Sequence, residues 1–104
     1  MFGLFSPGKV SGFAKSLAQN VARRYPPAIA NNPDQIVSQR RIAEILEEVF
    51  ASAHRFEQEN RLGLLSRLSL RSTFKQKMRE AGYEEKFADF AAASLRNHLT
   101  KSSK

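Results

Sequence analysis

The chain has 104 residues, of which 41% are hydrophobic and 26% charged, and its net charge is +7 at pH 7. This length suits one domain with a single hydrophobic core, and the apolar content argues against a chain that is disordered throughout. The sequence has no cysteine, which excludes disulfides, thiolate metal sites and cysteine nucleophiles. No apolar run approaches the roughly 18 residues of a membrane-spanning helix. The opening MFGLFSP also lacks the cationic lead-in of a signal peptide, so we expect a cytoplasmic protein with no transmembrane segment.

The positive charge is concentrated in one segment. Residues 61–79 hold six bases and no acid, whereas residues 34–60 and residues 80–89 each carry a net charge of −3. Four further bases, with no acid, lie in residues 1–33. Because a polyanion responds to local charge rather than to the average over the chain, segment 61–79 is the first candidate for a binding site.

Residues 1–8 are expected to form a flexible apolar arm. Phe2, Leu4 and Phe5 are apolar, and the glycines and the proline among them oppose regular structure. We expect these apolar side chains to dock on the core rather than to remain exposed.

The first helix is predicted over residues 11–25. Apolar residues recur there every three or four positions, namely Val10, Phe13, Leu17, Val21 and Tyr25. Pro26 and Pro27 cannot donate the next backbone hydrogen bonds, so they should end the helix. Residues 26–32 are then expected to form an extended connector.

A long central helix is predicted over about residues 34–60. Asn32 can cap it, Pro33 fits its first position and Asp34 suits the positive end of the helix dipole. Its apolar residues fall on one face of a 3.6-residue period and should be buried: Ile42, Ile45, Leu46, Val49, Phe50, Ala53 and Phe56. The helix should fray between Asn60 and Gly63.

Two more helices are predicted, over residues 64–81 and 83–100. Ser69 allows a break in the first of them, and Gly82 should end it. The expected buried residues are Leu65, Leu68, Leu70, Phe74 and Met78 in the first, and Phe87, Phe90, Ala91, Leu95 and Leu99 in the second. The predicted fold is therefore all-α: about four helices packed around the long central helix, in a single domain spanning residues 9–100, with residues 101–104 as a disordered tail.

The candidate binding residues lie in segment 61–79. Four of them are spaced four apart and should form a cationic row along one helix, and two others lie beside it: Arg67, Arg71, Lys75 and Arg79, with Arg61 and Lys77. Arg23 and Arg24 would extend the row if the first helix packs alongside. The leading hypothesis is a non-enzymatic protein that binds DNA or RNA through these residues. In the alternatives, the row pairs with acids of the central helix (Glu44, Glu47, Glu48), or an acidic protein or a second copy engages it in an interaction or assembly module.

The segment LSLRSTFKQKMREAGY also has the features of a DNA-recognition helix. A serine can start it, Phe74 and Met78 can anchor its inner side, and Arg71, Lys75 and Arg79 would point outward. Over about twenty residues it resembles the helix-turn-helix motif, with Leu62 to Arg67 as the short preceding helix. The same sequence also fits an ordinary amphipathic helix that ends at a glycine cap.

Catalysis, cofactors and metal ions are not expected. His54 and His98 fall on different predicted helices, and neither has the Glu-x-x-His spacing of di-metal bundles. Glu57 follows His54 by three residues and could contact it, a pair that is more often a surface contact than a catalytic dyad. Binding of the apolar arm and first helix to a membrane surface is a minor alternative, because it competes with the core for the same apolar residues.

Overall fold

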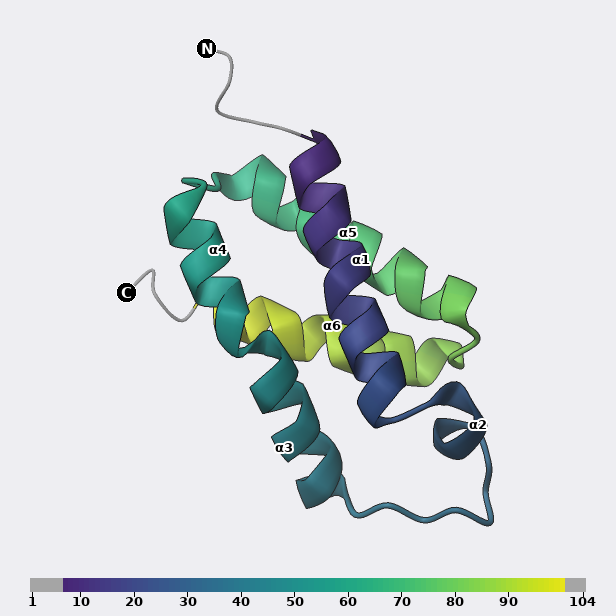
Figure 1. Ribbon diagram of the computed structural model, residues 1–104. Helices are drawn as coiled ribbons and strands as arrows, with labels where there is room; N and C mark the ends of the chain where they lie inside the picture. The colour runs from purple at the N-terminus through teal and green to yellow at the C-terminus, as the bar shows by residue number, and fades with distance from the viewer. Residues whose placement is uncertain (1–6, 101–104) are drawn as a thin grey trace.

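Every regular element that the computed structural model describes, over residues 7–100, is helical (Figure 1). In chain order these are α1 (Pro7–Arg24), α2 (Pro27–Ala30), α3 (Gln39–Val49), a 3₁₀ turn (Phe50–Ser52), α4 (Ala53–Glu59), α5 (Leu64–Ala81) and α6 (Glu85–Thr100). The predicted all-α bundle is confirmed. The predictions for residues 1–6 of the arm and for the tail at 101–104 lie outside the described residues.

Helix α1 begins four residues earlier than predicted. Pro7 stands at its first position, where a missing N–H costs nothing, so the proline expected to keep the chain irregular starts the helix instead. The predicted apolar row faces the core, with Val10, Leu17 and Val21 buried. The connector expected to be extended contains the single-turn helix α2, closed by a hydrogen bond from Ala30 N to Pro26 O of 2.9 Å.

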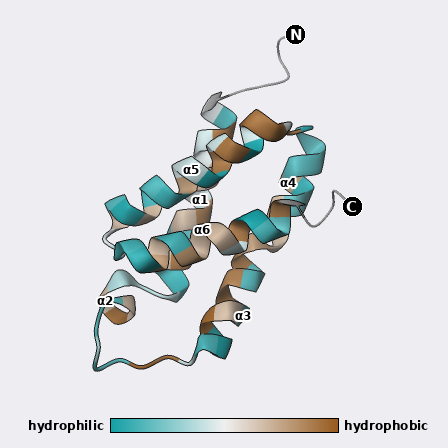
Figure 2. Cartoon of the chain, turned by 180° about the vertical axis from the view of Figure 1, so that it is seen from behind, coloured by the Kyte–Doolittle hydropathy of each residue, from teal (hydrophilic) through white to brown (hydrophobic). Residues whose placement is uncertain are grey.

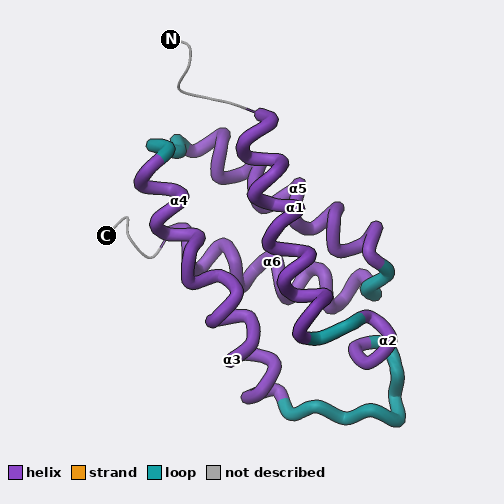
Figure 3. The backbone as a smooth tube through the Cα atoms, viewed as in Figure 1, coloured by secondary structure: helices purple, strands orange, loops and turns teal. Residues whose placement is uncertain are grey.

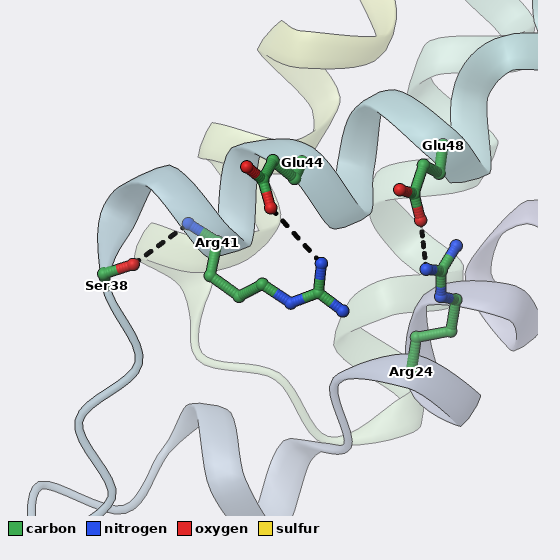
Figure 4. Close-up of polar contacts among 5 residues, drawn as sticks. All are labelled: Arg24, Ser38, Arg41, Glu44 and Glu48. Carbon is green, nitrogen blue, oxygen red and sulfur yellow. Dashed lines mark hydrogen bonds and ion pairs between the residues drawn. The ribbon is translucent and has the colours of Figure 1, made fainter.

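The predicted start of the central helix near residue 34 is wrong. The Asn32 side chain accepts a hydrogen bond from Asp34 N (2.9 Å), but this closes only a local turn. Helix α3 begins at Gln39, where the Ser38 hydroxyl accepts a hydrogen bond from Arg41 N (Figure 4). A helix from residue 34 would gain little burial, because Ile36 is 89% exposed, so residues 31–38 form an irregular connection (Figure 3).

The central helix is also divided. The 3₁₀ turn at Phe50–Ser52 separates α3 from α4, although the two follow one another in nearly the same direction (Figure 1). The predicted apolar stripe nevertheless faces inward: five of its residues are buried (Ile45, Leu46, Val49, Phe50, Ala53), and Ile42 and Phe56 are partly buried against the core. Phe56 stacks on Phe13 of α1 with ring centroids 4.0 Å apart.

Helix α5 occupies the middle of the bundle. Its most extensive contacts are with α1 and α6, whereas α3 and α4 pack mainly on α1 and α6. The segment predicted as the central helix is therefore not the centre of the packing. Leu70, Phe74 and Met78 are fully buried. The helix continues without a break across Ser69.

Gly82 ends α5 as predicted, for a backbone reason. Its φ of 110° is in the left-handed region, which favours glycine, and Tyr83 N donates to Met78 O at 3.2 Å in the manner of a Schellman cap. The Gly82 carbonyl accepts from the Asn31 side chain (2.8 Å), and the Tyr83 hydroxyl donates to Tyr25 O (2.5 Å). These bonds fix the α5–α6 turn against the end of α1 and the residues around α2.

Candidate interaction surface on α5

The inward side of α5 determines where its cations lie. Leu62, in the turn before α5, begins a buried row that recurs every four residues through Ser66, Leu70, Phe74 and Met78. Each of the four predicted row cations follows one of the buried residues of α5 directly, so the row runs along the flank next to the core. This flank faces α4 and α6, and acidic side chains of both helices lie near its cations.

Arg67 contacts a buried carboxylate. Its Nε lies 2.8 Å from Oε2 of Glu57 in α4, and the Glu57 side chain is only 6% exposed. The contact is an ion pair rather than a hydrogen bond, because the Nε–H is not directed at the carboxylate. His54 Nδ1 lies 3.8 Å from the other oxygen of Glu57. A buried carboxylate needs such counter-charges, so Arg67 is committed to the fold rather than available to a ligand.

Lys75, Lys77 and Arg79 also have acidic neighbours, at the surface. Lys75 contacts Asp89 and lies 3.9 Å from Glu85 in α6. Arg79 lies 3.6 Å from Glu85 as well, and Lys77 lies 3.6 Å from Glu80 one turn along α5. Exposed pairs of this kind contribute about 0–1 kcal/mol each, so a stronger ligand could replace the carboxylates.

Arg61 and Arg71 have no ion-pair partner among residues 7–100. Arg61 is exposed in the α4–α5 turn, where its φ is 50°. Arg71 is half-buried, and its Nε has no hydrogen-bond partner within this part of the chain. The six predicted binding residues therefore do not form one open cationic strip, because carboxylates of the chain lie against four of them.

The acids that contact the row are not the ones predicted. Glu48 pairs with Arg24 and Glu44 with Arg41, as Figure 4 shows. Glu47 lies 3.7 Å from His98. Arg23, named with Arg24 as an extension of the row, donates to Asn20. None of the three glutamates of α3 contacts the row: Glu48 pairs with α1, Glu44 within α3 and Glu47 with α6. The acids beside the row come from α4, α6 and α5 itself.

The helix-turn-helix prediction fails in its details. A short helix from Leu62 to Arg67 is not formed, because α5 runs unbroken from Leu64. A helix, a turn and a helix do follow one another as α4, residues 60–63 and α5. In DNA recognition the first residues of the second helix reach the bases, yet α5 presents leucines there, which offer no hydrogen bonds to base edges.

Those leucines form an exposed apolar surface, which we call the leucine patch: Leu64, Leu65 and Leu68 are 68%, 77% and 43% exposed. The hydrophobic colour at the start of α5 marks it in Figure 2. Two of the three were predicted to be buried. The four-residue spacing of the buried row from Leu62 to Met78 could have predicted their exposure. That row already occupies the inward side of the helix, so Leu64, Leu65 and Leu68 point away from it.

A second apolar feature lies between the N-terminal ends of α3 and α6. Ile42, Phe87 and Phe90 line a groove of about 280 Å³, with Gln39, Glu84 and Lys86 as its polar residues. Phe90 was predicted to be buried but is 51% exposed. The rings of Tyr25 and Tyr83 pack against Phe87, at centroid distances of 5.3 and 5.2 Å. We call this feature the α3–α6 groove.

Neither histidine is among the residues of the leucine patch or those that line the α3–α6 groove. His98 packs edge-on against Phe50 at 5.6 Å, with Nδ1 3.0 Å from Ser94 O. Burial, followed by the neighbouring Tyr25, raises the pKa of Tyr83 to about 12, and its hydroxyl serves the α5–α6 turn. Among residues 7–100 no group of three or more potential ligands is placed to hold a metal ion.

The chain matches no protein-family model, and comparison with curated proteins and with solved structures found no match. Of the helices within residues 7–100, none has both the length and the apolar character needed to cross a bilayer.

Proposed function

We propose that this chain is a non-enzymatic protein-interaction module that docks a partner through the leucine patch. The observation that carries the proposal is the exposure of Leu64, Leu65 and Leu68 side by side at the start of a helix whose opposite side is fully buried. Contiguous apolar surface of this kind marks interaction sites in soluble proteins. The proposal includes no cofactor and keeps the cytoplasmic location expected from the sequence.

The leucine patch is large enough to anchor a partner but too small to hold it alone. Its exposed fractions amount to somewhat less than two fully exposed leucines, so complete burial would contribute about 3–6 kcal/mol. Losing translational and rotational freedom costs at least about 4 kcal/mol. The partner must therefore add contacts around the leucines. Arg61 and Arg71, which have no ion-pair partner among residues 7–100, favour acidic groups there.

Nucleic-acid binding through segment 61–79 is the second candidate, and the weak surface pairs of Lys75, Lys77 and Arg79 favour it. Phosphates could replace those carboxylates at little cost, and Arg61 and Arg71 would join them. Arg67 would contribute least, because it neutralises the buried Glu57. Binding of this kind would weaken steeply with salt, whereas docking through the leucine patch would not.

Site-specific photo-cross-linking separates the two candidates. A photoreactive residue placed at Leu65, and in a matched control at Gln76 on the exposed side of the same helix, would be irradiated in an extract of cells that express the chain. We expect an adduct at position 65 that protease destroys and nuclease does not, and that a Leu68→Glu substitution in the same photoreactive chain abolishes. An adduct that nuclease removes would favour nucleic acid, and equal adducts at both positions would overturn docking through the leucine patch.

A further inference from the structure

We propose that the partner of the leucine patch is a second copy of this chain, which receives the patch in its α3–α6 groove. The inference rests on the proposed function and names the occupant of the same surface. It joins two apolar features that remain exposed among residues 7–100, one on the surface of a helix and one in a groove.

The α3–α6 groove has the size and chemistry to accept leucine side chains. Its volume is about 280 Å³, and Ile42, Phe87 and Phe90 supply its apolar surface. A dry apolar cavity of about 150 Å³ already admits a benzene molecule, so the groove accommodates a larger aliphatic group. Because Phe87 is held by Tyr25 and Tyr83, one wall of the groove is preformed. Phe90, half exposed, is the residue that gains most from being covered.

The leucine patch cannot fill the groove of its own chain. The α4–α5 turn lies at the end of α1 where Phe13 stacks on Phe56, whereas the groove lies at the other end, where Tyr25 contacts Phe87. Tyr25 lies twelve positions after Phe13, just past the end of α1, which corresponds to a rise of about 18 Å. Figures 1 and 3 likewise place the start of α5 far from the starts of α3 and α6. Contact between patch and groove must therefore join different copies.

The charges around the two surfaces are complementary. Arg61, just before the leucine patch, and Glu84, at the groove, are both exposed and have no ion pair among residues 7–100. In a second pair the signs are reversed: the acid Glu59 lies at the end of α4, near the leucine patch, and the base Lys86 lies at the groove. Two contacts between opposite charges can therefore form around the leucines when the patch of one copy approaches the groove of the next.

The contact joins two different surfaces, so it can build two kinds of assembly. Two copies that make it reciprocally about a two-fold axis, each patch in the other's groove, close as a dimer; copies that make it once each add further copies until a ring closes. Both arrangements need one patch and one groove for each contact, whereas a symmetric contact of patch with patch needs no groove.

Two charge-introducing variants test the arrangement by sedimentation velocity. Leu65→Glu removes the patch and keeps the groove, whereas Phe90→Glu removes the groove and keeps the patch; both residues are exposed, so circular dichroism should stay helical. We expect each variant alone to self-associate at least about 30-fold more weakly than wild type, the effect of losing a strong interface residue. An equimolar mixture should form a one-to-one complex and nothing larger, since one intact patch and one intact groove remain. Gln76→Glu, on the exposed side of α5, should associate as wild type does.

The alternative outcomes are distinguishable. Phe90→Glu that still dimerises while Leu65→Glu does not would overturn the groove as the receiving surface and leave the proposed function standing. A wild-type chain that stays monomeric to millimolar concentration would overturn self-assembly, while the cross-linking at position 65 decides separately whether another protein docks there. Leu65→Glu that associates like wild type would remove the leucine patch from the contact altogether.

Discussion

Replacing Arg67 by methionine should destabilise the protein far more than the same change at Arg79, although both belong to one cationic row. Arg67→Met leaves the carboxylate of Glu57, 6% exposed, without its nearest counter-charge. Breaking a buried pair by removing one partner costs about 3–5 kcal/mol. We expect about 3 kcal/mol, the lower end of that range, because Arg67 is itself 28% exposed and His54 lies 3.8 Å from Glu57.

The assay is urea unfolding followed by circular dichroism. For a small domain the free energy of unfolding falls by about 1–3 kcal/mol per molar urea, so Arg67→Met should lower the midpoint by about 1–3 M. Arg79→Met, whose pair with Glu85 is exposed on both sides, should change the free energy of unfolding by less than about 1 kcal/mol. Adding Glu57→Gln to Arg67→Met should recover part of the loss, since the stranded charge is gone. Equal midpoints for the two methionine variants would refute the assignment of Arg67 to the fold.

Three further predictions follow from the core and the α5–α6 turn. Phe50→Ala should cost about 3–5 kcal/mol of unfolding free energy, because Phe50 is fully buried against Phe74; Phe90→Ala is the matched control, and a comparable loss there would contradict the placement of the two rings. Gly82→Ala should cost about 1–2 kcal/mol from left-handed backbone alone, since a Cβ would meet Pro27 only at an ordinary 3.7 Å; an unchanged midpoint would contradict the φ of 110°. The raised pKa of Tyr83 means that its neutral form is favoured in the folded state, so this stabilisation is complete below the ordinary pKa of 10.0 and is lost as pH rises toward about 12; unfolding midpoints should fall over that interval in wild type and less in Tyr83→Phe, and identical alkaline profiles would refute it.

The helices could be predicted because burial and periodicity agree along most of the chain. The inward residues of α1 and of α3–α4 lie on faces that a 3.6-residue repeat identifies, and Gly82 ends α5 where only glycine accommodates the backbone. The predicted start of α3 is wrong because both Asn32 and Ser38 can accept a backbone hydrogen bond as a helix cap. The packing of the residues that follow decides between them, because Ile45 and Leu46, soon after Ser38, are buried.

The surface of α5 was harder to predict, because two apolar registers overlap there. Leu62 and Ser66 continue the buried row, so a serine takes an inward position and Leu64, Leu65 and Leu68 face solvent. Hydropathy alone ranks leucine above serine for burial and assigns the opposite sides. The ion pairs of the row were not predictable either, since Glu57, Glu85 and Asp89 reach it only through the packing of α4 and α6 on α5.

The central claim is that α5 meets its partner through the leucines at its start rather than through its cations. The yield of photo-adduct at position 65 relative to position 76, compared at low and high salt, tests this most directly. We predict a protein adduct at position 65 alone, with a yield that falls only slightly with salt, because the leucines contribute more to the contact than the charges around them. A yield that collapses with salt, or an adduct that consists of nucleic acid, would contradict the claim.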